Sequence, residues 1–412
     1  MSIRKRTWKT GKGVEKEAWV VDYVDQGGVR RLKTFDKKKE ADTFASTASV
    51  EVRAGVHVAD SASCTVQEAG DLWISAAEAA GLERSTTAEY RAHLRLHIAP
   101  VIGATLLSKL SPPIVRGLED RLRQDGRSPA MLRKIMGSLG ALLADAQERG
   151  LVARNVVRDI RGRRVRGKDR QADRRLKGRL KVGVDVPTRA EVKAVVEAAT
   201  GRVRPFIITA IFTGLRASEL RGLRWVDVDF ESRALHVRQR ADRFNAMGRP
   251  KSEAGERTVP LPPLVVNILR EWKLACPKRD TGRKNDQGEA IKELHLVFPN
   301  GKGNVESLRN IVQRWLEPCE LKAGVATDTG EKDEQGVPIL APKYPGLHAF
   351  RHFFASWCIN RTQDGGLGLP AKVVQERLGH STITMTLDVY GHLFPRGDDA
   401  DELAKAERAL LG

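Results

Sequence analysis

Five side chains that can bind and attack a phosphodiester follow one another in the C-terminal half of this 412-residue chain. They are Arg216, His348, Arg351, His380 and Tyr390. A phosphodiester resists cleavage because its charge repels nucleophiles, its five-coordinate transition state concentrates negative charge, and its leaving alkoxide needs a proton. Arginine binds the non-bridging oxygens with a planar, charged fork. The set therefore predicts an enzyme that attacks a phosphodiester covalently and needs no metal ion.

Tyr390 is the member of this set that can form a stable covalent phosphoester. An unperturbed phenol has a pKa near 10, so nearby cations must help it to ionise. A tyrosyl phosphodiester keeps the energy of the broken bond, and a DNA hydroxyl can then reverse the reaction without ATP. This chemistry favours strand exchange over simple cutting.

The histidines allow a second interpretation, a metal site, because His348, His380 and His392 occur near carboxylates. No two of them have the close helical spacing of metal ligands, so we expect no metal and no other cofactor. The cysteines are scattered, with no Cys-x-x-Cys pair, which indicates reduced thiols rather than a zinc site or a disulfide framework.

The charge of the chain indicates a polyanionic partner. It has 71 Lys+Arg against 52 Asp+Glu and a formal net charge of +19. Clustered cations bind nucleic acid by releasing its counterions, although a basic protein can also use its charge only to avoid aggregation. An RNA-binding protein lacks support, since aromatic residues are only 5% of the chain and no aromatic-rich strand motif is present. No apolar stretch reaches membrane-spanning length, so we expect a cytoplasmic, nucleoid-associated protein without membrane contact.

The pattern predicts a multidomain, mainly α-helical protein with small β-sheets. Residues 1–60 form the first domain, with strands at 18–23 and 29–35 and a helix that begins near Lys37, capped by Asp36. The second strand carries basic side chains that either enter a DNA groove or only form a solvated face, namely Arg30, Arg31 and Lys33.

Residues 64–155 are expected to form a four-helix domain. Its helix starts include two capping boxes, Thr65–Glu68 and Thr86–Glu89. Residues 156–186 then read as a basic linker, either a solvated spacer or a strap along a DNA backbone. We favour the strap, because a spacer needs no such excess of charge, and expect phosphate contacts from Arg161, Arg163, Arg164 and Arg166.

Residues 187–395 are expected to form a mixed α/β domain. An apolar helix ends at Gly214, strands are expected at 225–229, 235–238 and 257–261, and residues 324–343 read as a surface loop. The tail, residues 396–412, has the pattern of an amphipathic helix that packs either on its own protomer or on a neighbour. No internal repeat is evident.

Four motifs give this chain its resemblance to the tyrosine recombinase (phage integrase) family, in the family's order and at compatible spacing. They are Thr213-Gly214-Leu215-Arg216-Ala217-Ser218-Glu219-Leu220, Leu347-His348-Ala349-Phe350-Arg351-His352, Leu378-Gly379-His380-Ser381 and Val389-Tyr390-Gly391-His392. The three-part organisation also resembles integrases of temperate phages and mobile elements. In those proteins an N-terminal domain binds arm-type sites, a helical domain grips the core site, and a catalytic domain completes a clamp around DNA.

The resemblance implies a role for each residue of the set. Tyr390 would be the nucleophile, leaving a 3′-phosphotyrosyl link and a free 5′-hydroxyl. Arg216 and Arg351 would bind the scissile phosphate. His348 and His380 would hydrogen-bond its oxygens, and His348 could also assist proton transfer from the tyrosine.

The family also uses a lysine on a β-hairpin as proton donor to the leaving 5′-oxygen. Lys251, which precedes the expected strand at 257–261, fits that place, and the alternative is a plain phosphate contact. Glu219 is expected to support the local structure or Arg216 through a salt bridge.

The resemblance favours a site-specific DNA recombinase that integrates a phage or mobile element and can also excise it. It implies double-stranded DNA with core and arm-type sites as partner, a homo-tetramer on DNA, and an excisionase and a host DNA-bending protein as accessory partners. The alternatives are a type IB topoisomerase-like enzyme and a DNA-binding regulator that kept the fold and lost catalysis.

Overall fold

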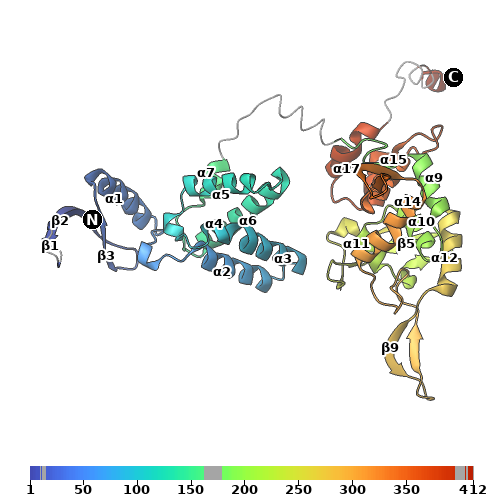
Figure 1. Ribbon diagram of the computed structural model, residues 1–412, viewed down its shortest axis with the longest axis horizontal. Coiled ribbons are helices and arrows are strands. Elements are labelled where there is room, and N and C mark those ends of the chain that lie inside the picture. Colours follow the sequence, from blue (N-terminus) through green and yellow to red (C-terminus); the bar gives the residue numbers. More distant parts are fainter. Residues whose placement is uncertain (10, 12–14, 162–178, 395–403, 405–406, 412) are drawn as a thin grey trace. The chain divides into compact units, whose positions relative to one another are not determined.

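The computed structural model describes residues 1–9, 11, 15–161, 179–394, 404 and 407–411 (Figure 1). The chain divides into two compact units, residues 1–166 and 167–412, and each is described by itself. Within the described ranges, none of the helices combines the length and the apolar character needed to cross a membrane.

The first unit begins with a three-stranded antiparallel sheet of β1 (Ser2–Lys9), β2 (Glu15–Val24) and β3 (Arg30–Phe35), in that order. The helix α1 (Lys38–Arg53) packs on it over a small core that includes Val21, Tyr23 and Ala41. The strand β1 was not predicted, because nearly all of its side chains are exposed and show no apolar alternation. The predicted cap Asp36 is wrong: the backbone stays extended one residue further and Lys37 is the N-cap.

A helical bundle follows in the same unit. It contains α2 (Val66–Ala79), α3 (Arg84–His93), a π-helical turn (Leu94–Ile98), α4 (Ala99–Ile102), α5 (Pro112–Gln124), α6 (Pro129–Glu148) and α7 (Val156–Arg161). The capping box of Thr65 and Glu68 is confirmed. The second predicted capping box is wrong, because α3 already begins at Arg84, soon after the left-handed Gly81 ends the preceding turn.

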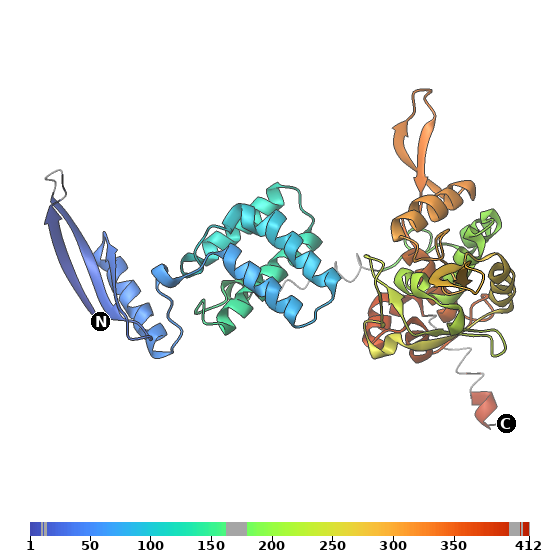
Figure 2. The same ribbon diagram turned by 90° about the horizontal axis from the view of Figure 1, so that it is seen from below.

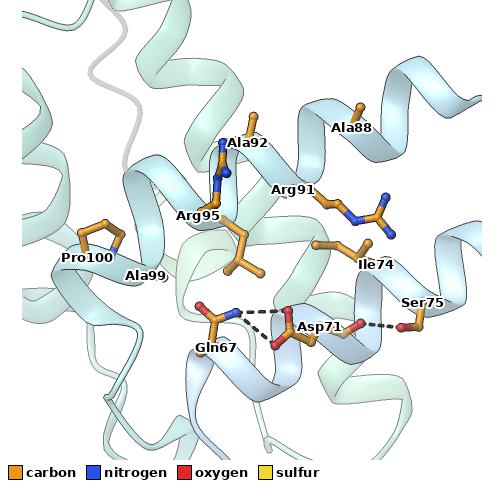
Figure 3. Close-up of a pocket in the computed structure, with 11 residues that line it drawn as sticks. Gln67, Asp71, Ile74, Ser75, Ala88, Arg91, Ala92, Arg95, Ala99 and Pro100 are labelled. Atoms are coloured by element: carbon orange, nitrogen blue, oxygen red, sulfur yellow. Dashed lines mark hydrogen bonds between the residues drawn. The ribbon is translucent and has the colours of Figure 1, made fainter.

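The end of the bundle reaches into the segment that the sequence assigned to the linker. Val156 and Val157 of α7 are buried in the same core as the apolar face of α6. A groove of about 720 Å³ lies between α2 and the α3–π-helix segment, lined by both charged and apolar side chains (Figure 3). Gln67 Nε2 donates to both carboxylate oxygens of Asp71 on one wall, and Arg91 and Arg95 lie on the other.

The second unit is built around α10 (Val203–Thr213), which is buried on nearly all sides. Around it lie α9 (Arg189–Ala198), α11 (Ala217–Gly222), α12 (Pro263–Ala275), and α15 (His348–Ile359). A three-stranded antiparallel sheet has the order β4 (Val228–Asp229), β5 (Ala234–Val237), β8 (Arg257–Pro260), and β6 (Arg240–Ala241) pairs with β7 (Met247–Gly248). The expected strand at 225–229 is mostly wrong, because residues 225–227 form a 3₁₀ turn.

The C-terminal helices of this unit carry most of the predicted chemistry. α13 (Leu308–Asn310) continues through a π-helical segment (Ile311–Leu316) into α14 (Glu317–Lys322), and α16 (Ala371–Leu378) and α17 (Ile383–Tyr390) follow α15. A second apolar cluster joins α15, α16 and α17 and includes Phe354, Cys358, Leu378 and Tyr390. In the tail, residues 407–411 are helical with exposed side chains, and most of the remaining predicted tail lies outside the described residues.

Two β-hairpins project from this unit, and they share a sequence. β9 (Arg279–Lys284) and β10 (Ala290–Glu293) form the first, visible at the lower edge in Figure 1, and β11 (Ala326–Lys332) and β12 (Pro338–Pro342) form the second, in orange in Figure 2. The pattern Asp-Thr-Gly-x-Lys-x-x-Gln-Gly-x-x-Ile starts at Asp280 and again at Asp328. Thr281 Oγ1 donates to the Ile291 carbonyl at 2.8 Å, as the matching threonine of the second hairpin does to its isoleucine.

Both expectations for this region were therefore wrong. Residues 324–343 contain a hairpin rather than a loop, and the chain has a short internal repeat. The strands escaped prediction because they project away from the core, so that the alternation of apolar and polar residues typical of a half-buried strand is missing.

Candidate active site

Arg216 lies directly after the end of α10, where Gly214 turns the chain with φ of 60°. A Cβ at Gly214 would lie 2.3 Å from Phe354 of α15, so this approach requires glycine. Arg216 is the N-cap residue of α11 and its side chain is partly exposed. Its Nη1 donates to Glu219 at 2.8 Å and its Nη2 donates to the carbonyl of Gly379 at 3.0 Å.

Arg351 lies on α15 and is only 2% exposed. Its Nη1 donates to the carbonyl of Gly214 at 2.6 Å and its Nη2 to the carbonyl of Leu378 at 2.5 Å. The two arginines are thus bound to the consecutive carbonyls of Leu378 and Gly379, at the end of α16. These bonds take two of the five N–H donors of each guanidinium, and leave the donors that a phosphate would need.

Glu219 holds this arginine pair in place. It is 3% exposed and accepts from Arg216 and from both terminal nitrogens of Arg257, at 2.9 and 3.2 Å. Burial alone would raise the pKa of Glu219, but Arg257 and Arg216 outweigh it and lower that pKa to about 2. The expected salt bridge with Arg216 is present, and Arg257 is a further member of the site that the sequence did not indicate.

Tyr390 ends α17 and is 1% exposed. Its hydroxyl lies 2.8 Å from Nδ1 of His352, which follows Arg351 on α15. The ring of His348, at the exposed start of α15, meets the ring of His352 edge-on, with centroids 4.7 Å apart. His352 was not predicted as a site residue, although its position four residues after His348 places both rings on one helix face.

His380 also packs against the tyrosine. Its ring is nearly parallel to that of Tyr390, with centroids 6.3 Å apart, and its Nδ1 lies 2.9 Å from Thr386 Oγ1. His392, the third histidine of the alternative metal reading, bonds through Nε2 to the carbonyl of Leu180 at 2.8 Å. The predicted set, without Lys251, therefore gathers within one region of α11, α15, α16 and α17.

Burial keeps the nucleophile Tyr390 and the two neighbouring histidines uncharged. Burial raises the pKa of Tyr390 to about 12, although Arg351 and Arg216 act in the opposite direction. Burial, and after it the positive charge of Arg351, lowers the pKa of His380 to about 4. Burial, His348 and Arg351 lower the pKa of His352 to about 4 as well. At neutral pH the phenol is protonated and both imidazoles are uncharged.

Lys251 lies in an exposed turn between β7 and β8. The same turn continues to Ala254, whose carbonyl would lie 2.9 Å from a Cβ at Gly379, and to Arg257. Lys251 is thus carried by a segment that packs close to Gly379, whose carbonyl Arg216 binds.

The predicted DNA contacts of the first unit are paired within the protein. Arg30 bonds to Asp22, Arg31 to Asp25 at 2.8 Å and Lys33 to Asp60 at 2.8 Å. These carboxylates offset part of the positive charge on β3. The other predicted contacts, Arg163, Arg164, Arg166 and the side chain of Arg161, lie outside the described residues.

Comparison with known proteins identifies the family of the chain. The family model described as "Phage integrase family" matches residues 187–396, half of the chain. The chain belongs to this family. A "Tyrosine recombinase XerC-like" protein of Caldanaerobacter subterraneus is 24% identical over 406 residues, which cover 94% of each chain. The transposase from transposon Tn916 of Enterococcus faecalis is 29% identical over 191 residues, 45% of this chain and 41% of the transposase.

Solved structures of phage and transposon integrases share the fold. The Tn1549 transposon integrase, in complex with a circular intermediate DNA, matches with a TM-score of 0.58 and 20% identity over 84% of this chain and 100% of that chain. A λ integrase dimer bound to a core site matches with a TM-score of 0.52 and 14% identity over 78% of this chain and 97% of that one.

The comparisons confirm the expected fold class and activity. The chain is a site-specific tyrosine recombinase of the mobile-element type, an enzyme that breaks and rejoins DNA. The relatives are recombinases, integrases and transposases, so the topoisomerase and inactive-regulator readings are not favoured.

Proposed function

We propose that this recombinase integrates a mobile element into DNA, and in the reverse direction excises it, through a 3′-phosphotyrosyl intermediate on Tyr390. The observation that carries the proposal is the meeting of Arg216 and Arg351 at the carbonyls of Gly379 and Leu378, in the same cluster as Tyr390. Arg216 lies 163 positions from Gly379 in the sequence, and Arg351 lies 27 positions from Leu378, yet both side chains meet at this short segment.

The geometry supports a role for each side chain. Arg216 and Arg351 bind the non-bridging oxygens of the scissile phosphate and stabilise the charge that develops on them. His348, exposed at the start of α15, and His380 hydrogen-bond those oxygens. Lys251 protonates the leaving 5′-oxygen from its exposed turn.

The buried nucleophile indicates that DNA binding must uncover it. With 1% of its surface exposed, Tyr390 offers no approach to a backbone phosphate, so the part of the chain that covers it must move aside before attack. In the DNA-free protein the raised pKa and the burial of the phenol both suppress reaction with stray phosphates. Activity therefore depends on correct assembly on the target.

The remaining domains bind the target DNA, on which the partners assemble. Residues 1–60 bind arm-type sites, and the helical bundle, residues 64–155 together with α7, grips the core site. The basic linker after the bundle, with Arg161, Arg163, Arg164 and Arg166, contacts the DNA backbone on the way to the catalytic domain at 187–395. The overall charge of +19 suits this double-stranded DNA partner. We expect a tetramer on DNA, as in the solved λ integrase tetramer on a Holliday junction, with an excisionase and a host bending protein setting direction.

A nicked suicide substrate tests the proposal. The DNA spans the junction of the circularised element from the chain's own genome. The nick lets the short fragment that carries the free 5′-hydroxyl diffuse away after cleavage, so that the covalent adduct cannot be religated and accumulates. We expect an adduct with the wild-type protein and with Tyr90→Phe, whose ring stacks on Trp73 in the helical bundle. Tyr390→Phe should bind the DNA with unchanged affinity and give no adduct. Absence of an adduct with the wild-type protein on this DNA would reject the enzymatic proposal.

A further inference from the structure

The family resemblance points to His348 as the residue that assists proton transfer from the tyrosine, but the structure places another histidine on the reacting atom. Nδ1 of His352 lies 2.8 Å from the hydroxyl oxygen of Tyr390. His348 lies one helical turn earlier and meets His352 edge-on. The ring of His380 is parallel to the tyrosine ring, and its Nδ1 is bonded to Thr386.

We infer that His352 is the proton acceptor for Tyr390 during strand cleavage, and that it holds the phenol in place beforehand. This inference rests on the proposed function. In the cleavage step the Tyr390 oxygen forms a bond to phosphorus, and the bond from phosphorus to the 5′-oxygen breaks. The phenol proton passes to Nδ1 of His352, and Lys251 supplies the proton to the 5′-oxygen. Ligation runs the same transfers in reverse.

His352 lies on the helix that also carries the phosphate-binding arginine. Because Arg351 and His352 are adjacent on α15, one arginine of the phosphate clamp and the proton acceptor lie on the same helix. The groups that act on His352 are His348 and Arg351 from its own helix, the exposed Asp185 and the Tyr390 phenol from α17. The first two disfavour a proton on His352, whereas Asp185 favours one.

Substrate binding changes this balance in the direction that catalysis needs. In the free protein His352 is neutral, so it can accept a hydrogen bond from the phenol but is a weak base. A bound phosphate brings negative charge to Arg216 and Arg351 and offsets the cation next to His352. The basicity of His352 therefore rises only when a phosphate occupies the clamp, and the acceptor becomes effective together with its substrate.

The test compares His352→Asn with the wild-type protein on two nicked DNA substrates. An asparagine amide can occupy the position of Nδ1 and bond to the phenol, but it cannot take a proton. We expect unchanged DNA binding and adduct formation slower by about 100-fold or more, the usual contribution of a positioned acid or base. His236→Asn is the matched control, since His236 contacts Thr258 on the exposed part of the β5–β8 pair.

The second substrate carries sulfur in place of the 5′-bridging oxygen at the scissile bond. A thiolate leaves without protonation, so Lys251→Ala should recover on this DNA whereas His352→Asn should stay slow. The acid limb of the pH–rate profile should also flatten in His352→Asn. Rates within threefold of wild type, or recovery of His352→Asn on the sulfur substrate, would overturn the inference.

A second variant with a smaller side chain distinguishes a loss of proton transfer from a folding defect. His352→Ala should regain adduct formation when free imidazole is added, in proportion to the imidazole base present, if it refills the vacated acceptor position. If His352→Ala has the melting temperature of the wild-type protein and imidazole does not raise its rate of adduct formation, this result would argue against proton transfer at this position. Failure of the wild-type protein to form any adduct would instead refute the proposed function itself, so the two failures are distinguishable.

Discussion

Glu219→Gln is the substitution whose cost can be worked from the site most directly. The carboxylate is buried, accepts from Arg216 and Arg257, and has a pKa of about 2 against a usual value of 4.5. Since each pKa unit is worth about 1.4 kcal/mol, the charged form stabilises the fold by about 3 kcal/mol at neutral pH. Removing one partner of a buried ion pair costs about 3 to 5 kcal/mol in measured cases, which agrees in size.

The pH dependence of this stabilisation has a definite sign. The pKa of Glu219 is lower in the folded protein than in the unfolded chain, so its contribution is fully present above about pH 4.5 and is lost as the pH falls towards 2. Glu219→Gln should therefore lower the free energy of unfolding at pH 7 by about 3 kcal/mol and leave it nearly unchanged near pH 2.

Urea-induced unfolding of the full chain, monitored by hydrogen exchange, separates the effect on the second unit from any effect on the helical bundle. Peptides covering α11 and β8 should lose protection in Glu219→Gln, while peptides covering α6 should not. Glu231→Gln, an exposed carboxylate in the turn before β5, serves as control and should change stability by less than about 0.5 kcal/mol. A loss below about 1 kcal/mol at pH 7 would refute the reasoning, because it would mean that the two arginines do not depend on this charge.

Three further predictions follow from the same geometry. Gly214→Ala should destabilise the catalytic unit by about 1 to 3 kcal/mol in thermal or urea unfolding and abolish adduct formation, because a Cβ there meets Phe354 and displaces the carbonyl that holds Arg351; a fully active variant would contradict this. The pKa of about 4 for the buried His380 should make stability fall as the pH drops from 6.5 towards 4, and His380→Asn should flatten this fall in a pH series of melting temperatures. Neutralising Arg161, Arg163, Arg164 and Arg166 should make the slope of log affinity against log salt less steep by about 0.9 for each phosphate that the linker no longer neutralises, whereas an unchanged slope would show that the linker does not touch phosphate.

The sequence indicated the members of the site better than it indicated their contacts. The order of Arg216, Arg351, His380 and Tyr390 was enough to predict phosphodiester chemistry. The carbonyls of Leu378 and Gly379, on which the two arginines converge, could not be predicted, because they depend on how the end of α16 meets α15 and the start of α11. Helical spacing relates side chains within one helix only, and it says nothing of neighbours brought by the fold.

His352 illustrates the same limit at a single residue. Spacing placed it on one face of α15 with His348, but the approach of the Tyr390 hydroxyl is a tertiary contact with α17. A histidine beside a predicted phosphate-binding arginine was the signal that could have drawn attention to it. Arg257 could not be predicted for a similar reason, because the pattern of a strand does not show which buried carboxylate, here Glu219, its side chain contacts.

Regular elements were predictable where one face of the element is buried. The Thr65 capping box and the helix end at Gly214 were predicted, because each combines a local backbone signal with an apolar pattern. The strand β1 and the two projecting hairpins were missed, because their strands pair with little burial and so leave no apolar alternation.

In the proposed reaction Tyr390 becomes covalently bonded to a DNA phosphorus held by Arg216 and Arg351. Mass spectrometry of the trapped adduct, after nuclease and trypsin digestion, tests it directly, since trypsin should release residues 378–396 as one peptide whose only tyrosine is Tyr390. We predict a 3′-linked nucleotide on the Tyr390 oxygen, absent from Arg216→Ala and Arg351→Ala. A nucleotide on a serine or threonine of this peptide or on another residue, or an adduct that survives both arginine substitutions, would contradict the account.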